Sequence, residues 1–186
     1  MKYVLSLFIL ITSITSIHAQ KKVGDVTIPV KVNFNETNLE LNGAGIREKY
    51  WMDMYVGALY LETTTNNATS IINDDKIMAI KLHIVSSLIT AEKMISAVDE
   101  GFKKSTKGKQ AALKAEIDKF KSVFSTEINK EDVYDFVYIP NKGTVIYKNN
   151  KLSSTIKGLE FKKALFGIWL CSEPADADLK AAMLGK

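Results

Sequence analysis

The residues of this 186-residue chain best suited to chemistry are a single arginine and a tyrosine that follows it. Of the 25 basic residues, 24 are lysines and only Arg47 is an arginine. A guanidinium is always charged and can donate two parallel hydrogen bonds to a carboxylate. Tyr55 offers a phenol hydroxyl on the next predicted strand. If these two side chains converge, they could hold a carboxylate or an enolate oxygen.

Whether they converge depends on the hairpin between two predicted strands. Residues 39–48 show a period of two, and residues 52–61 are almost continuously apolar, as in a strand covered on both faces. A three-residue loop would place Arg47 and Tyr55 on one face, over space left empty by the glycines of Gly43-Ala44-Gly45. A two-residue loop would point Tyr55 to the other face. Both geometries remain open from the sequence.

A competing interpretation gives Arg47 only a structural role. It could form a cross-strand salt bridge with Asp53 on a solvated face, worth ~0.2–1 kcal/mol. A lysine would serve that pair almost as well, and this chain otherwise uses lysine throughout. We therefore favour a functional role for Arg47.

Other chemistries are excluded by what the sequence lacks. After residue 19 there is one histidine, His83, and one cysteine, Cys171, so no His/Cys metal cluster and no intramolecular disulfide can form. His83 alternates onto the face of Lys81 and is a poor candidate for a catalytic triad. Gly43-Ala44-Gly45 lacks the third glycine and following helix of a nucleotide-binding loop. We expect no metal and no cofactor, and the dispersed net charge of +4 indicates no nucleic-acid partner.

The first 19 residues have the pattern of a signal peptide. A short basic start precedes the apolar run Val4 to Ile14, and Ala19 supplies a small residue for cleavage. The mature chain, residues 20–186, is then expected to be a single domain, exported to the periplasm or secreted. No later apolar run is long enough to span a membrane.

The remaining pattern predicts an α+β fold with a mostly antiparallel sheet. Period-two segments predict further strands, and helical periodicity follows in the middle and at the end of the chain, with Thr90 as a predicted N-cap. The predicted strands are 26–32 (an edge strand, because of Pro29), 39–48, 52–61, 78–85, 133–139, 144–148 and 151–156, and the predicted helices are 91–102, 113–124, 161–169 and 176–184.

Several segments resemble motifs of the chalcone isomerase-like family, including its bacterial branch, over roughly residues 25–185. They are Gly43–Lys49, Met54–Glu62, Tyr138–Thr144, Ile156–Phe161, Ala164–Pro174 and Leu184-Gly185. The resemblance implies an open-faced β-sandwich, in which a large antiparallel sheet carries a layer of helices on one side.

The resemblance also implies roles for four residues. The family includes flavonoid-forming isomerases and non-enzymatic fatty-acid binders, and in both the arginine matching Arg47 lines the cleft. In the binders, a tyrosine matching Tyr55 helps to hold the ligand carboxylate, whereas the isomerases have threonine there. The isomerases also carry a tyrosine, a lysine and an asparagine on a helix, where this chain has Thr90, Lys93 and Ala97.

Three functions follow as hypotheses. The favoured one is a non-catalytic binder of a small apolar carboxylic acid, such as a fatty acid, with Arg47, Tyr55, Thr90 and Lys93 as ligand contacts. The alternative is an isomerase, or intramolecular lyase, acting on a chalcone-like, phenolic or enone substrate with Arg47 and Tyr55 as catalytic residues. The third is an envelope scaffold for a protein partner, which a closed, filled space at Arg47 would favour.

Overall fold

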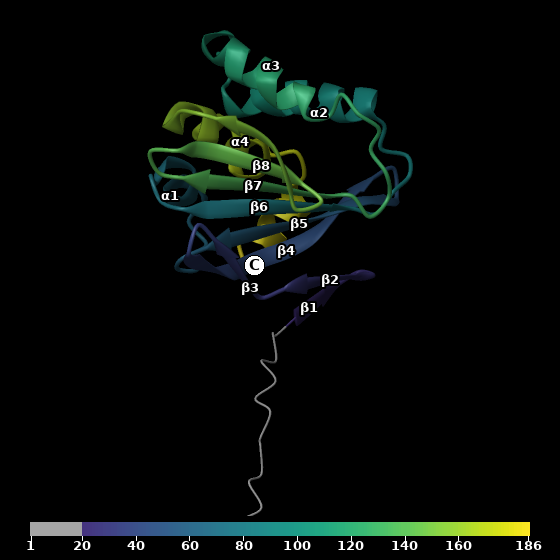
Figure 1. The fold of residues 1–186 in the computed structure, drawn as a ribbon. Coiled ribbons are helices and arrows are strands. Elements are labelled where there is room, and N and C mark those ends of the chain that lie inside the picture. The colour runs from purple at the N-terminus through teal and green to yellow at the C-terminus, as the bar shows by residue number, and fades with distance from the viewer. Residues whose placement is uncertain (1–19) are drawn as a thin grey trace, which may run out of the picture.

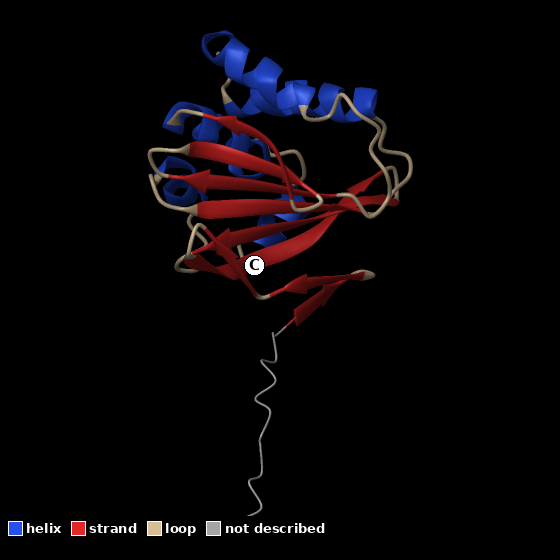
Figure 2. Ribbon diagram, viewed as in Figure 1, coloured by secondary structure: helices blue, strands red, loops and turns tan. Residues whose placement is uncertain are grey.

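The strands form one large antiparallel sheet and one small one in the computed structural model, which describes residues 20–186 (Figures 1 and 2). The predicted signal peptide, residues 1–19, lies outside the described residues. In the seven-stranded sheet each strand pairs with its neighbours in sequence, from β3 to β9, and β1 and β2 pair separately. Within the described residues the strands are β1 Gln20–Val23, β2 Val26–Pro29, β3 Lys31–Phe34, β4 Thr37–Lys49, β5 Met52–Leu61, β6 Met78–Ile84, β7 Val133–Ile139, β8 Gly143–Lys148 and β9 Lys151–Ile156.

The helices gather on one side of the large sheet, which confirms the predicted fold class. They are α1 Ala68–Asn73, α2 Ala91–Ser105, α3 Lys114–Ser122, which follows a 3₁₀ turn at Gln110–Leu113, α4 Leu159–Leu170 and α5 Ala177–Met183. In the part of the chain that is described, none of these helices is long and apolar enough to cross a membrane.

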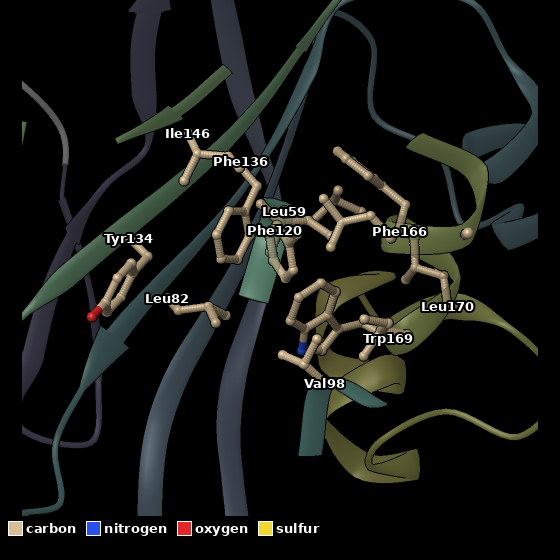
Figure 3. Close-up of a cluster of buried hydrophobic side chains, with 14 of the residues drawn as sticks. Leu59, Leu82, Val98, Phe120, Tyr134, Phe136, Ile146, Phe166, Trp169 and Leu170 are labelled. Carbon is tan, nitrogen blue, oxygen red and sulfur yellow. The ribbon is translucent and has the colours of Figure 1, made fainter. Parts of the chain in front are cut away.

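The layer between sheet and helices is rich in aromatic side chains (Figure 3). Phe120 of α3 lies at its centre. The ring centroids of Phe102, Phe124, Phe136 and Phe161 are 5.3–6.0 Å from that of Phe120. Such offset and edge-on contacts stabilise the core beyond the burial of apolar surface. These contacts hold α2, α3 and α4 against the sheet.

The opposite face of the sheet is also buried. The sheet curls over this face, so that Phe34 of β3 and Tyr147 of β8 stack with ring centroids 6.4 Å apart. The β1–β2 hairpin packs on the same face, where the Tyr60 hydroxyl donates a 2.9 Å hydrogen bond to the Pro29 carbonyl. This explains why nearly every residue from Val56 to Leu61 is apolar and buried, as the sequence predicted for a strand covered on both sides.

The segment 26–32 differs from its prediction as a single edge strand. It is divided at Val30 into β2, in the small sheet, and β3, at the edge of the large sheet. Pro29 is the last residue of β2, because its ring removes a backbone donor that a continuing strand would use.

The glycines of β4 do not leave empty space beside Arg47, and that prediction was wrong. Helix α5 fills this space. A Cβ atom at Gly43 would lie 2.1 Å from the Ala182 carbonyl oxygen, and one at Gly45 would lie 2.6 Å from the Ala182 Cβ. The glycines thus permit the backbone of α5 to pack directly on the sheet. This close packing sets the position of the segment that precedes α5.

Candidate functional site

The β4–β5 hairpin places Arg47 and Tyr55 directly opposite each other. The turn has two residues, Tyr50 and Trp51, but the register shifts at Met54, which is an extra residue in β5. This β-bulge returns Tyr55 to the face of Arg47. Neither predicted geometry was right. The turn has two residues, as in the geometry that would have separated the two side chains. The bulge nevertheless places Arg47 and Tyr55 on one face, as in the geometry with a three-residue loop.

The competing salt bridge between Arg47 and Asp53 is not formed among the described residues. Asp53 lies opposite Glu48, whose side chain points to the other face of the hairpin. The Arg47 Nη1 group instead donates a hydrogen bond to the backbone carbonyl of Ala175, just before α5. The guanidinium is half-buried, and one of its nitrogens is held by a neutral oxygen. Its charge therefore remains available to a further partner.

Tyr55 is buried beside this guanidinium. The Trp169 indole Nε1 donates a 2.9 Å hydrogen bond to the Tyr55 hydroxyl oxygen, which orients the phenol. Burial raises the pKa of Tyr55 above its ordinary value, and the positive charge of Arg47 opposes this in part. The hydroxyl consequently stays protonated at neutral pH. Because its oxygen accepts from Trp169, its own proton can be donated elsewhere.

Arg47 and Tyr55 both line an open cavity of about 630 Å³. This volume is within the range of about 300–1,000 Å³ common for small-molecule sites. The rest of the wall is largely apolar, and several of its side chains are labelled in Figure 3. The apolar lining residues include Met52, Met54, Leu82, Leu88, Ile89, Met94, Ala97, Val98, Phe120, Phe124, Phe136, Ile168, Trp169 and Ala175.

Thr90 and Lys93 also line the cavity, at the start of α2. Both make local contacts there. The Thr90 hydroxyl caps α2 by accepting a 3.3 Å hydrogen bond from the Lys93 amide, as the sequence predicted for an N-cap. The Lys93 ammonium donates a 3.0 Å hydrogen bond to the Leu88 carbonyl. The structure thus brings all four predicted site residues to one cavity, and their role as ligand contacts stays a prediction.

The polar part of the cavity is electropositive. Four basic side chains line it, Arg47, Lys49, Lys93 and Lys104, against two acidic ones. The pKa of Glu100 lies below its usual range, mainly because of the Lys104 ammonium and to a smaller degree because of Lys49 and Arg47. This field favours an anion over a cation at the cavity mouth. No three His, Cys, Asp or Glu side chains gather into a metal-binding cluster within residues 20–186.

The sequence profile of one family, described as chalcone isomerase-like, matches residues 20–185. The chain belongs to the chalcone isomerase-like family. A solved fatty-acid binding protein from Arabidopsis thaliana has the same fold, with a TM-score of 0.69 at 16% sequence identity. The match covers 86% of this chain and 92% of the plant protein. No curated protein sequence matches the chain.

Two residues of this chalcone isomerase-like site were not predicted from the sequence. Trp169 orients Tyr55, and the backbone of Ala175 holds Arg47. A tryptophan preceded by apolar residues in a helix looks like an ordinary core residue, and a backbone carbonyl has no sequence signature. A polar indole nitrogen needs a partner when it is buried, which is the one sequence-level indication that Trp169 would meet a hydroxyl.

Proposed function

We propose that this protein is a non-catalytic binder of a small apolar carboxylic acid, such as a fatty acid. The observation that carries the proposal is the pairing of Arg47 and Tyr55 in the wall of a cavity whose remaining lining is largely apolar. The Arabidopsis protein of the same fold is a fatty-acid binding protein, which supports the same class of ligand here.

The carboxylate would lie between the guanidinium and the phenol. Arg47 donates one hydrogen bond to Ala175 and has further N–H groups for a ligand oxygen. Tyr55 accepts from Trp169 and can donate its own proton to the second oxygen. Charge-assisted hydrogen bonds of this kind are short and strong. The alkyl chain would extend toward Val98, Phe120 and the other apolar side chains of the cavity.

The test is direct binding of a fatty acid to delipidated mature protein, measured by native mass spectrometry and by thermal stabilisation. We expect Arg47→Ala to weaken binding by about 10- to 100-fold and Tyr55→Phe by about 3- to 10-fold, because each removes hydrogen bonds to a charged group. Lys151→Ala, which removes a charge from an exposed position on β9, is the matched control. Equal affinity of Arg47→Ala and the unmodified protein would contradict the proposal.

The isomerase alternative would use the same Arg47–Tyr55 pair to stabilise an enolate oxygen. The cavity offers few free hydrogen-bond donors at the positions where the isomerases carry a tyrosine, a lysine and an asparagine. The Thr90 hydroxyl and the Lys93 ammonium are engaged in the N-terminal turn of α2, and Ala97 has no polar group. Turnover of a chalcone that Arg47→Ala abolishes would favour the isomerase over the binder. The open cavity at Arg47 argues against the third hypothesis, a scaffold that uses the fold only to present a surface.

A further inference from the structure

Large exposed apolar side chains are concentrated at the mouth of the cavity. Among the described residues five large hydrophobic side chains are exposed: Tyr50 (73%), Trp51 (96%), Met52 (40%), Leu88 (43%) and Leu152 (65%). The first three form the β4–β5 turn and its flank, and Leu88 lies in the loop before α2. Tyr50, Met52 and Leu88 line the cavity, so three of the five lie at its mouth. Trp51 does not line the cavity but stands between Tyr50 and Met52 in the chain.

The turn contains two aromatic residues, Tyr50 and Trp51, that its backbone conformation does not favour. Tyr50 and Trp51 have φ angles of +54° and +60°, a left-handed conformation that bulky residues rarely adopt. Two other two-residue hairpin turns of the same sheet, Asn35-Glu36 and Asn149-Asn150, have similar positive φ angles and carry polar residues. Asparagine suits this conformation, whereas tyrosine and tryptophan do not. A contact outside the folded chain would explain why aromatics occupy the turn.

The charges beside the turn define the kind of partner. Lys49 and Lys93 lie at the same mouth as the aromatic side chains, and basic side chains outnumber acidic ones two to one in the cavity lining. The acidic residues of the hairpin, Glu48 and Asp53, face the other side. In membrane-associated proteins, tyrosine and tryptophan side chains lie at the bilayer–water interface, and nearby lysines are attracted to anionic lipid headgroups.

We propose that the tip of the β4–β5 hairpin and Leu88 dock on an anionic lipid bilayer. Trp51 and Tyr50 would enter the interfacial region, and the lysines would contact the headgroups. In this orientation the cavity mouth faces the membrane, so an apolar acid passes between bilayer and cavity without crossing water. This last step rests on the proposed function, whereas the docking itself does not.

The experiment measures binding of the mature protein to vesicles by co-sedimentation and by the emission of Trp51. The second tryptophan, Trp169, is buried, so the difference between the spectra of the unmodified protein and Trp51→Ser isolates Trp51. With vesicles of phosphatidylcholine and phosphatidylglycerol, we expect a blue shift of Trp51 emission and at least 10-fold weaker binding for Trp51→Ser. We expect weaker binding to phosphatidylcholine alone and in high salt.

Two further variants keep the result interpretable. Leu152→Ser removes an equally exposed apolar side chain on β9 and should bind vesicles like the unmodified protein. The double variant Tyr50→Asn/Trp51→Gly has the preferred residues for this turn, so it should fold at least as stably and still lose vesicle binding.

Several outcomes would overturn the docking proposal. One is vesicle binding by Trp51→Ser equal to that of the unmodified protein. Another is a blue shift of Trp51 that depends on protein concentration without vesicles, since this would identify a second copy of the chain as the occupant. Fatty-acid binding in solution separates the two proposals, because Trp51 does not line the cavity. Loss of vesicle binding by Trp51→Ser with unchanged fatty-acid binding supports docking, and vesicle binding without fatty-acid binding would sink only the proposed function.

Discussion

At the scale of single residues, Lys162 shows how backbone carbonyls can hold a buried charge. This lysine of α4 is fully buried, and its ammonium points to the end of α1. There it donates hydrogen bonds to three backbone carbonyls, those of Ile71 (2.6 Å), Ile72 (3.0 Å) and Asp74 (2.8 Å). The last carbonyls of a helix have no partners within the helix itself, so Lys162 closes α1 and ties it to α4.

Lys162 also makes the stability of the protein depend on pH. Burial lowers the pKa of this ammonium to about 8 from about 10.5. Between these two values the unfolded chain binds a proton that the folded chain has released, so stability rises with pH. We expect the unfolding free energy of the unmodified protein to increase relative to that of Lys162→Met by up to ~3 kcal/mol from pH 7 to pH 10.

Urea unfolding of both proteins at a series of pH values measures this difference. Taking the difference cancels the other lysines and tyrosines that titrate in the same range. A difference that stays constant between pH 7 and pH 10 would show that Lys162 keeps its proton in the folded state.

At the scale of elements, β4 and α5 act as one unit that positions Arg47 in the cavity wall. The strand contributes the arginine, and the segment before the helix contributes the carbonyl that holds it. Their contact depends on Gly43, Gly45 and Gly57, whose missing side chains let α5 approach the sheet. The packing of α5 on the sheet thereby sets the position of the carbonyl that holds Arg47.

A compensating pair of substitutions tests this contact. Gly45→Ala places a Cβ 2.6 Å from the Cβ of Ala182 and should destabilise the fold by about 1–3 kcal/mol. Ala182→Gly removes that atom at a cost of about 1 kcal/mol in helix propensity. We expect the double variant to lose less stability in thermal unfolding than the two single variants lose together. Its loss of fatty-acid affinity should likewise be smaller than the sum of the two single losses. Strict additivity of the two changes would contradict direct packing at this point.

The elements whose ends are set by local chemistry could be predicted from the sequence. The start of α2 at Thr90 is one, because the cap involves only neighbouring residues. The Asn149-Asn150 turn is another, since asparagine tolerates the required backbone. By contrast, β1 has the polar sequence Gln20 to Val23 and was not predicted as a strand. Its position depends on pairing with β2, which local pattern does not reveal.

At the scale of the whole molecule, the fold class could be predicted, but the contacts that complete the site could not. The order of strands and helices is sufficient for an α+β fold with a mostly antiparallel sheet. The layer of helices on one side was implied by the resemblance to the chalcone isomerase-like family. The bulge at Met54, the packing of α5 on Gly43 and the bond from Arg47 to Ala175 depend on residues distant in sequence. Such contacts leave no periodic pattern, so the convergence of Arg47 and Tyr55 remained an alternative until the structure resolved it.

A further prediction at this scale concerns processing of the chain. We propose that residues 1–19 direct export and are removed after Ala19. Expression of the full chain in a host with a secretion pathway should yield a protein of 167 residues that starts at Gln20, as measured by intact mass. Ala19→Arg, which places a bulky charge at the cleavage position, should retain the leader. An exported chain that still carries residues 1–19 would contradict the prediction.

The bond between Arg47 and Ala175 also has a consequence for the order of events during synthesis. These residues are 128 positions apart, so the strand leaves the ribosome roughly 6–26 s before the segment that fixes its arginine. The contact that fixes Arg47 therefore forms only when the chain itself is almost complete. A chain that ends before Ala175 lacks the carbonyl that fixes Arg47, so under the proposed function it would bind an apolar acid less well than the complete chain.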